Sequence, residues 1–122
     1  MSKCKNMPML AISDEEIILS KVVGVLSRYG IYYLKRSEIL DLCSMLIMDM
    51  NAFLEKDPSA NNDYRFLLLS YSSFDAVIGY RISNYILFNY GKVIEAKKIS
   101  EYFKVRTGIE IHPAANIGHI FV

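Results

Sequence analysis

The sequence has no tryptophan, only three prolines and only two cysteines among its 122 residues. Two isolated cysteines, Cys4 and Cys43, are too few for a disulfide framework or a cysteine-rich metal site. No stretch near the N-terminus has the pattern of a secretory signal. We therefore expect a reducing, cytoplasmic location and no bound metal.

Long hydrophobic runs and a strong net charge are also missing. The longest apolar stretches, such as residues 66–69, fall far short of the roughly 20 residues that a membrane-spanning helix needs. The formal net charge is +1, and no basic run alternates with aromatic residues, as it would on a nucleic-acid-binding surface. We expect a soluble protein with neither a membrane nor a nucleic acid as partner.

The composition is that of a globular protein. Hydrophobic residues make up 52% of the chain and charged residues 22%, which is far from the composition of disordered chains. A chain of this length is also long enough to bury a core. Enough apolar surface is therefore available for one compact domain.

Helical patterns cover most of the chain. Ser13 and Glu16 have the spacing of a capping box, and apolar residues follow at helical spacing as far as Gly30. Further amphipathic helices are predicted at about residues 38–55, from 74 to near Gly91, and at 92–106. In the first of these three, the side opposite the apolar residues carries acidic residues, namely Glu38, Asp41 and Asp49.

The pattern changes after Thr107 and Gly108, where the last predicted helix ends. Residues 108–118 read GIEIHPAANIG, with Ile111 and Ile117 six residues apart. A six-residue period is typical of a β-helix coil, in which an aliphatic side chain points inward and small residues turn the corner. A single repeat cannot bury its own apolar face, so on its own it is a weak signal.

Three strings together resemble the serine O-acetyltransferase family: DPSA at 57–60, FDAVIGYRI at 74–82 and GIEIHPAANIG at 108–118. Their order and spacing agree with the family over about residues 50–122. The resemblance implies a mainly α fold, with an N-terminal helical domain followed by the start of a left-handed parallel β-helix. The helical domain would span residues 1–107, and residues 108–122 would form the first, incomplete hexapeptide-repeat coil.

The resemblance also implies an activity. Enzymes of this family transfer an acetyl group from acetyl-CoA to the hydroxyl of L-serine in cysteine biosynthesis, with acetyl-CoA as co-substrate and no permanently bound cofactor. They form trimer-based homo-oligomers, and some insert a C-terminal tail into cysteine synthase. The coils that bind coenzyme A and the tail would lie beyond Val122.

Two carboxylates are the site residues that the resemblance places in this sequence. Glu110 matches the carboxylate that orients the family's catalytic histidine, although aspartate is usual there, and Asp57 matches the aspartate that binds the ammonium group of serine. The catalytic histidine itself would lie a few residues past Val122. We therefore expect these 122 residues alone to be unable to complete the reaction.

Each of these residues also has a plainer explanation. Asp57 precedes Pro58 and can be a helix N-cap, and Glu110 can be the water-facing residue of an alternating strand. His112 matches a structural position of the family and His119 is not the catalytic histidine either.

Two further positions lie in the helix predicted from residue 74 to near Gly91. We expect Arg81 to order helix packing or a subunit interface, and Asn84 replaces a histidine found in some relatives. We attach no catalytic role to either residue.

Two other functions remain open from the sequence. The chain can be a helical oligomerisation or interaction module that catalyses nothing. It can also belong to a hexapeptide-repeat acyltransferase with another acceptor, against which the Asp57-Pro58 match argues.

Overall fold

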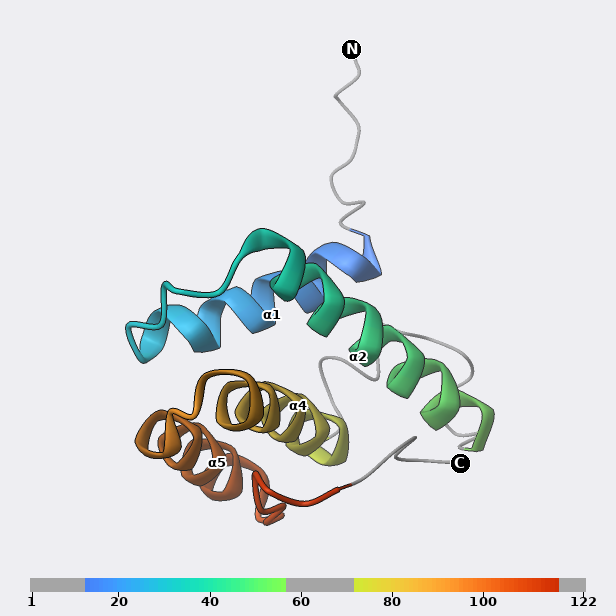
Figure 1. Ribbon diagram of the computed structural model, residues 1–122. Helices are drawn as coiled ribbons and strands as arrows, with labels where there is room; N and C mark the ends of the chain where they lie inside the picture. The colour runs from blue at the N-terminus through green and yellow to red at the C-terminus, as the bar shows by residue number, and fades with distance from the viewer. Residues whose placement is uncertain (1–12, 57–71, 117–122) are drawn as a thin grey trace.

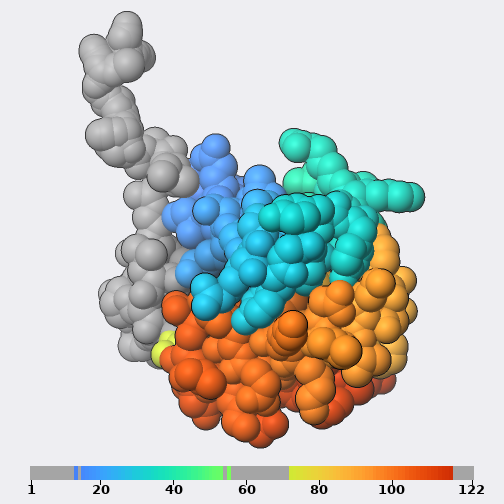
Figure 2. Space-filling model, turned by 90° about the vertical axis from the view of Figure 1, so that its left-hand side faces the viewer, coloured from blue at the N-terminus to red at the C-terminus, as the bar shows by residue number. Residues whose placement is uncertain are grey.

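The computed structural model describes residues 13–56 and 72–116, which form four helices labelled as in Figure 1. Helix α1 spans Asp14–Arg28, α2 spans Arg36–Lys56, α4 spans Ser72–Tyr90 and α5 spans Val93–Thr107. Helices α1 and α2 pack against each other; in Figure 1, α1 crosses the upper part and α2 slopes from there to the lower right. Helices α4 and α5 lie side by side below α1, and Figure 2 shows the blue-to-cyan N-terminal part over the orange α5. Helix α2 also contacts α4, so the two pairs share one core.

Helix α1 begins as its sequence predicts. The Ser13 hydroxyl accepts a hydrogen bond from the Glu16 N–H at 3.2 Å, and Glu16 Oε1 accepts one from the Ser13 N–H at 3.0 Å. This reciprocal pair satisfies two backbone donors that a helix N-terminus leaves unpaired. The predicted capping box is therefore confirmed.

Helix α2 begins at Arg36, two residues before the predicted start. The Glu38 carboxylate accepts a hydrogen bond from the backbone N–H of Lys35 at 2.8 Å, and the Lys35 carbonyl accepts from the N–H groups of Glu38 and Ile39. The Glu38 side chain thus reaches back to the residue before the helix and caps its N-terminus. This is why the helix starts before its first apolar residue.

All four helices contribute to the core. Its most deeply buried side chains come from α1 (Ile18, Val22), α2 (Leu42, Leu46, Met50), α4 (Phe74, Ile78, Ile82, Ile86) and α5 (Ile99). Most of α4 is buried as far as Ile86, because α2 and α5 cover different sides of it.

Helices α4 and α5 approach each other closely at Gly79. A Cβ atom built there would lie 2.5 Å from the ring of Phe103 and 2.8 Å from the Phe103 Cβ. Because real side chains do not approach so closely, only glycine allows this spacing of the two helices. Gly79 therefore sets how near α5 lies to α4.

The predicted helical domain agrees with the observed helices. The described ranges 13–56 and 72–116 contain no strand. The predicted coil at 108–122 is described only as far as Asn116, so the β-helix and the division into 1–107 and 108–122 stay predictions. In these same ranges, none of the helices is long and apolar enough to cross a membrane.

Candidate functional site around Glu110

The chain leaves α5 at Gly108, two residues before Glu110. Gly108 has a φ of +74°, and its N–H donates to the Lys104 carbonyl at 2.7 Å. This left-handed conformation suits glycine and ends the helix. The chain then turns away from the α5 axis and runs without regular secondary structure through residues 109–112.

Glu110 is exposed, with 62% of its side chain accessible to solvent. Its Oε1 lies 3.7 Å from the Lys104 Nζ, and the Lys104 side chain is itself 44% exposed. An ion pair this open contributes little to stability. The Glu110 carboxylate is therefore accessible and only loosely held, which leaves it free to accept a hydrogen bond from another group.

The segment that carries Glu110 is attached to α4 through its backbone carbonyls. Tyr80 Oη donates to the Ala115 carbonyl at 2.6 Å, and Asn84 Nδ2 donates to the carbonyls of Pro113 at 2.8 Å and Ala115 at 3.3 Å. From α5, Ser100 Oγ donates to the Ile111 carbonyl at 3.3 Å. These bonds replace the ladder that a strand would provide for the same carbonyls.

His112 takes part in a turn within this segment. Its Nδ1 accepts a hydrogen bond from the Ala114 N–H at 3.0 Å, and its carbonyl accepts from the Ala115 N–H at 3.0 Å. Because Nδ1 is the acceptor, the ring hydrogen of a neutral His112 lies on Nε2. These contacts agree with a structural role for His112.

Arg81 lies next to Tyr80 and joins α4 to α2. Arg81 Nε donates to Asp49 Oδ2 at 2.8 Å, and the second hydrogen bond joins the Arg81 guanidinium to Asp49 Oδ1 at 3.0 Å. Asp49 is only 2% exposed, so this is a buried, two-point ion pair. The expected role of Arg81 in helix packing is confirmed, whereas the prediction that Asp49 lies on the side of its helix away from the apolar residues is wrong.

The groups whose pKa departs most clearly from its usual value lie elsewhere, around Glu38. Hydrogen bonds from Tyr90 Oη, the Lys35 N–H and Tyr85 Oη lower the pKa of the Glu38 carboxyl. In return, burial and the Glu38 carboxylate raise the pKa of Tyr85 to about 12, and the hydrogen bond to Glu38 raises the pKa of Tyr90 to about 12. These contacts join α2 to the last turns of α4 and are structural.

Of the two predicted site residues, the structure therefore places only Glu110. Asp57 lies outside the described residues, as does His119. Sequence reasoning missed the anchoring roles of Tyr80, Asn84 and Ser100. A signal was present for the first two, since they are four residues apart on one side of a mainly apolar helix. Within the described ranges, no group of three or more His, Cys, Asp or Glu side chains could hold a metal ion.

Comparison with known proteins agrees with the family that the sequence motifs indicate. The chain is 36% identical over 111 residues to a serine acetyltransferase of Buchnera aphidicola subsp. Acyrthosiphon pisum, covering 88% of this chain and 36% of that protein. It is 36% identical over 77 residues to the serine acetyltransferase of Bacillus licheniformis, covering 63% of this chain and 35% of the relative. It is 32% identical over 78 residues to the serine acetyltransferase of Synechococcus elongatus, covering 63% of this chain and 31% of that relative.

The chain thus spans about a third of the length of the curated relatives it matches. No family model matches the chain. No solved structure matches it either. Several curated relatives with the same name nevertheless align with more than half of its residues. The chain is therefore similar to part of the serine acetyltransferases, the family that its motifs indicate.

Proposed function

We propose that these residues form the helical part of a serine O-acetyltransferase, which transfers an acetyl group from acetyl-CoA to the hydroxyl of L-serine in cysteine biosynthesis. The observation that carries the proposal is the 36% identity over 111 residues to a curated serine acetyltransferase. The geometry around Glu110 supports it, because an accessible carboxylate follows directly after the helical bundle.

In this proposal Glu110 is the carboxylate of a His–carboxylate dyad. The histidine takes the proton of the serine hydroxyl as its oxygen attacks the thioester carbonyl, and coenzyme A leaves as the thiol. Glu110 accepts a hydrogen bond from the other ring nitrogen and so keeps the nitrogen that accepts the serine proton free of hydrogen. The histidine comes from outside residues 1–122. When Glu110 accepts the hydrogen bond from this histidine, it gives up its loose ion pair with Lys104.

The remaining parts of the proposal extend the same family resemblance. Asp57 would bind the ammonium group of serine, and residues 108–122 would form the first coil of a left-handed β-helix. Acetyl-CoA is a co-substrate, and no cofactor is permanently bound. A trimer-based homo-oligomer, a cytoplasmic location and a contact with cysteine synthase through a C-terminal tail belong to this proposal as well.

The test is a thiol-release assay with acetyl-CoA and L-serine on the protein encoded by the complete gene. Serine-dependent release of coenzyme A supports the proposal. Release with a sugar or another amino acid but not with serine would favour an acyltransferase with a different acceptor. A protein that assembles but releases no thiol with any acceptor would favour the oligomerisation module.

A set of variants tests the role of Glu110. Glu110→Gln should lower kcat by about 10²-fold, because a positioned acid or base contributes roughly that much or more, whereas Glu110→Asp should keep most of it. Glu101→Gln, at an exposed glutamate of the preceding helix α5, is the matched control and should leave kcat unchanged. Equal activities for Glu110→Gln and Glu101→Gln would contradict the dyad.

A further inference from the structure

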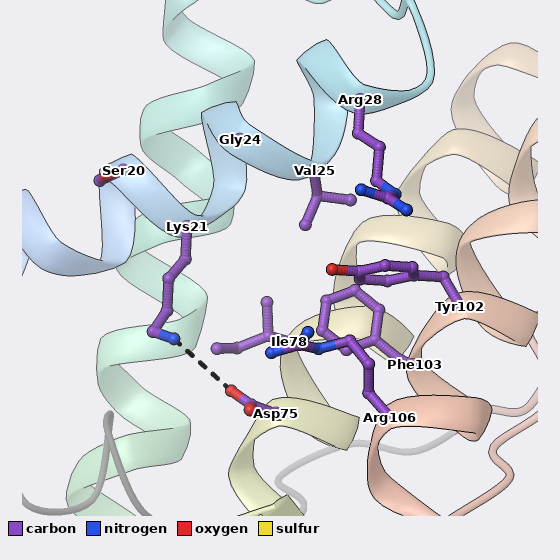
Figure 3. Close-up of a pocket in the computed structure, with 10 residues that line it drawn as sticks. All are labelled: Ser20, Lys21, Gly24, Val25, Arg28, Asp75, Ile78, Tyr102, Phe103 and Arg106. Atoms are coloured by element: carbon purple, nitrogen blue, oxygen red, sulfur yellow. Dashed lines mark ion pairs between the residues drawn. The ribbon is translucent and has the colours of Figure 1, made fainter.

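A second feature, separate from Glu110, lies among α1, α4 and α5. A cavity of about 240 Å³ opens there, and Figure 3 shows the side chains that line it. Its apolar lining comes from Val25, Ile78 and Phe103, which belong to the three different helices. The cavity therefore lies between three helices.

The charged side chains that line the cavity are mostly basic. Lys21 and Arg28 come from α1 and Arg106 from α5, whereas the one acidic residue of the lining is Asp75 of α4. The Lys21 Nζ lies 3.7 Å from Asp75 Oδ1, a long and partly exposed ion pair. The described lining thus has an excess of two positive charges, in a chain whose formal net charge is only +1.

The two arginines share one aromatic ring instead of a carboxylate. The guanidinium carbon of Arg28 lies 4.5 Å from the centroid of the Tyr102 ring, and that of Arg106 lies 5.3 Å from it. In Figure 3 Arg28 reaches down from α1 above the ring, and Arg106 lies below it. Among the described residues, neither guanidinium is paired with a carboxylate.

Contact with an aromatic face holds a guanidinium in place without using its N–H groups. The donors of Arg28 and Arg106 therefore stay available to an oxygen ligand. Each arginine alone has a structural explanation, because each is in the last turn of its helix, where the dipole favours a positive charge. That explanation does not account for their convergence on one ring at the edge of a cavity.

We propose that this cavity binds a compact anion of the phosphate or phosphomonoester class. Arg28 and Arg106 donate paired hydrogen bonds to its oxygens, as guanidinium groups do to phosphate. Lys21 adds a third positive charge, and Val25 and Ile78 contact a small organic substituent. The volume of about 240 Å³ is below that of a pocket for a drug-sized ligand, which limits the substituent to a few atoms.

The test uses inorganic phosphate and glycerol phosphate as probes, titrated into the purified protein at low ionic strength and followed by calorimetry. We expect saturable binding of one equivalent. Arg28→Gln and Arg106→Gln should each weaken it by about tenfold or more, as expected for charge-assisted hydrogen bonds. Arg36→Gln removes the same charge from an exposed position on α2 that does not line the cavity, and should leave the affinity unchanged.

Three results would overturn the proposal. The first is an absence of saturable binding by the unaltered protein, and the second is an equal loss of affinity in Arg36→Gln, which would indicate nonspecific charge attraction. The third is self-association that Arg28→Gln abolishes, without phosphate binding, which would assign the arginines to an acidic side chain of a second copy. Because both arginines are exposed, circular dichroism should show that each variant keeps its helices.

Discussion

Asp49 and Glu110 are two carboxylates paired with basic side chains, and their surroundings differ in almost every respect. Asp49 is 2% exposed and receives two hydrogen bonds from Arg81, whereas the Glu110 side chain is 62% exposed and its nearest cation, Lys104, lies 3.7 Å away. A buried charge must be paired to be tolerated, but an exposed one gains little from a partner. The first pair is therefore structural, and the second leaves a carboxylate available for chemistry.

The largest effect is expected from breaking the buried pair. Asp49→Ala leaves the Arg81 guanidinium without its main partner in the interior and should cost about 3–5 kcal/mol of the free energy of unfolding. Denaturant titration followed by circular dichroism measures this cost. Asp41→Ala, on the exposed side of the same helix, is the control and should change the free energy of unfolding by less than about 0.5 kcal/mol. A similar loss of unfolding free energy in Asp49→Ala and Asp41→Ala would show that burial and pairing do not give Asp49 a special structural role.

A smaller effect on stability is expected at high pH from Glu38 and its two tyrosine partners, Tyr85 and Tyr90. The burial of Glu38 is intermediate between that of Asp49 and that of Glu110. Tyr85 and Tyr90 have pKa values raised to about 12 in the folded protein, so folding favours their protonated forms. Their contribution is complete below pH 10, the usual tyrosine pKa, and should be lost as the pH rises from about 10 to about 12.

Unfolding midpoints in urea between pH 8 and pH 12 test this expectation. Tyr90→Phe should flatten the decline, whereas Tyr32→Phe, whose residue is 77% exposed, should leave it unchanged. Identical curves for Tyr90→Phe and the parent protein would show that Glu38 does not couple to this tyrosine.

A third, modest effect concerns the segment that carries Glu110. Tyr80→Phe removes the 2.6 Å hydrogen bond to the Ala115 carbonyl and should cost about 0.5–1.5 kcal/mol. Amide hydrogen exchange at Ala115 should become faster, because its N–H closes the turn with the His112 carbonyl. Unchanged exchange in Tyr80→Phe would mean that Asn84 and Ser100 hold the segment without Tyr80.

The smallest effect is expected from the open pair. Lys104→Gln should change the free energy of unfolding by less than about 0.5 kcal/mol, since both partners are largely exposed. Thermal unfolding of this variant beside Asp49→Ala gives the contrast directly. A cost comparable with that of Asp49→Ala would show that Glu110 has a structural role after all.

The helices could be predicted from the sequence because their signals are local. Ser13 and Glu16 mark the start of α1, and Gly108 marks the end of α5. The burial of Asp49 could not be predicted in the same way. It depends on Arg81, which is 32 residues away, and helical periodicity does not identify such a partner.

The candidate site follows the same division. Exposure of Glu110 was expected from its place between two isoleucines, which is a local pattern. The bonds from Tyr80 and Asn84 to the segment cross about 30 residues and end on backbone carbonyls, which carry no side-chain signature. Such contacts become visible only once the helices are packed.

The contact between Gly79 and Phe103 has a mechanical consequence. Phe103 lines the cavity, while Gly79 directly precedes Tyr80, whose hydroxyl holds the chain at Ala115. With no side chain between them, α4 and α5 can neither slide nor separate without losing this contact. The α4 and α5 walls of the basic cavity and the segment bearing Glu110 are therefore held by the same pair of closely packed helices.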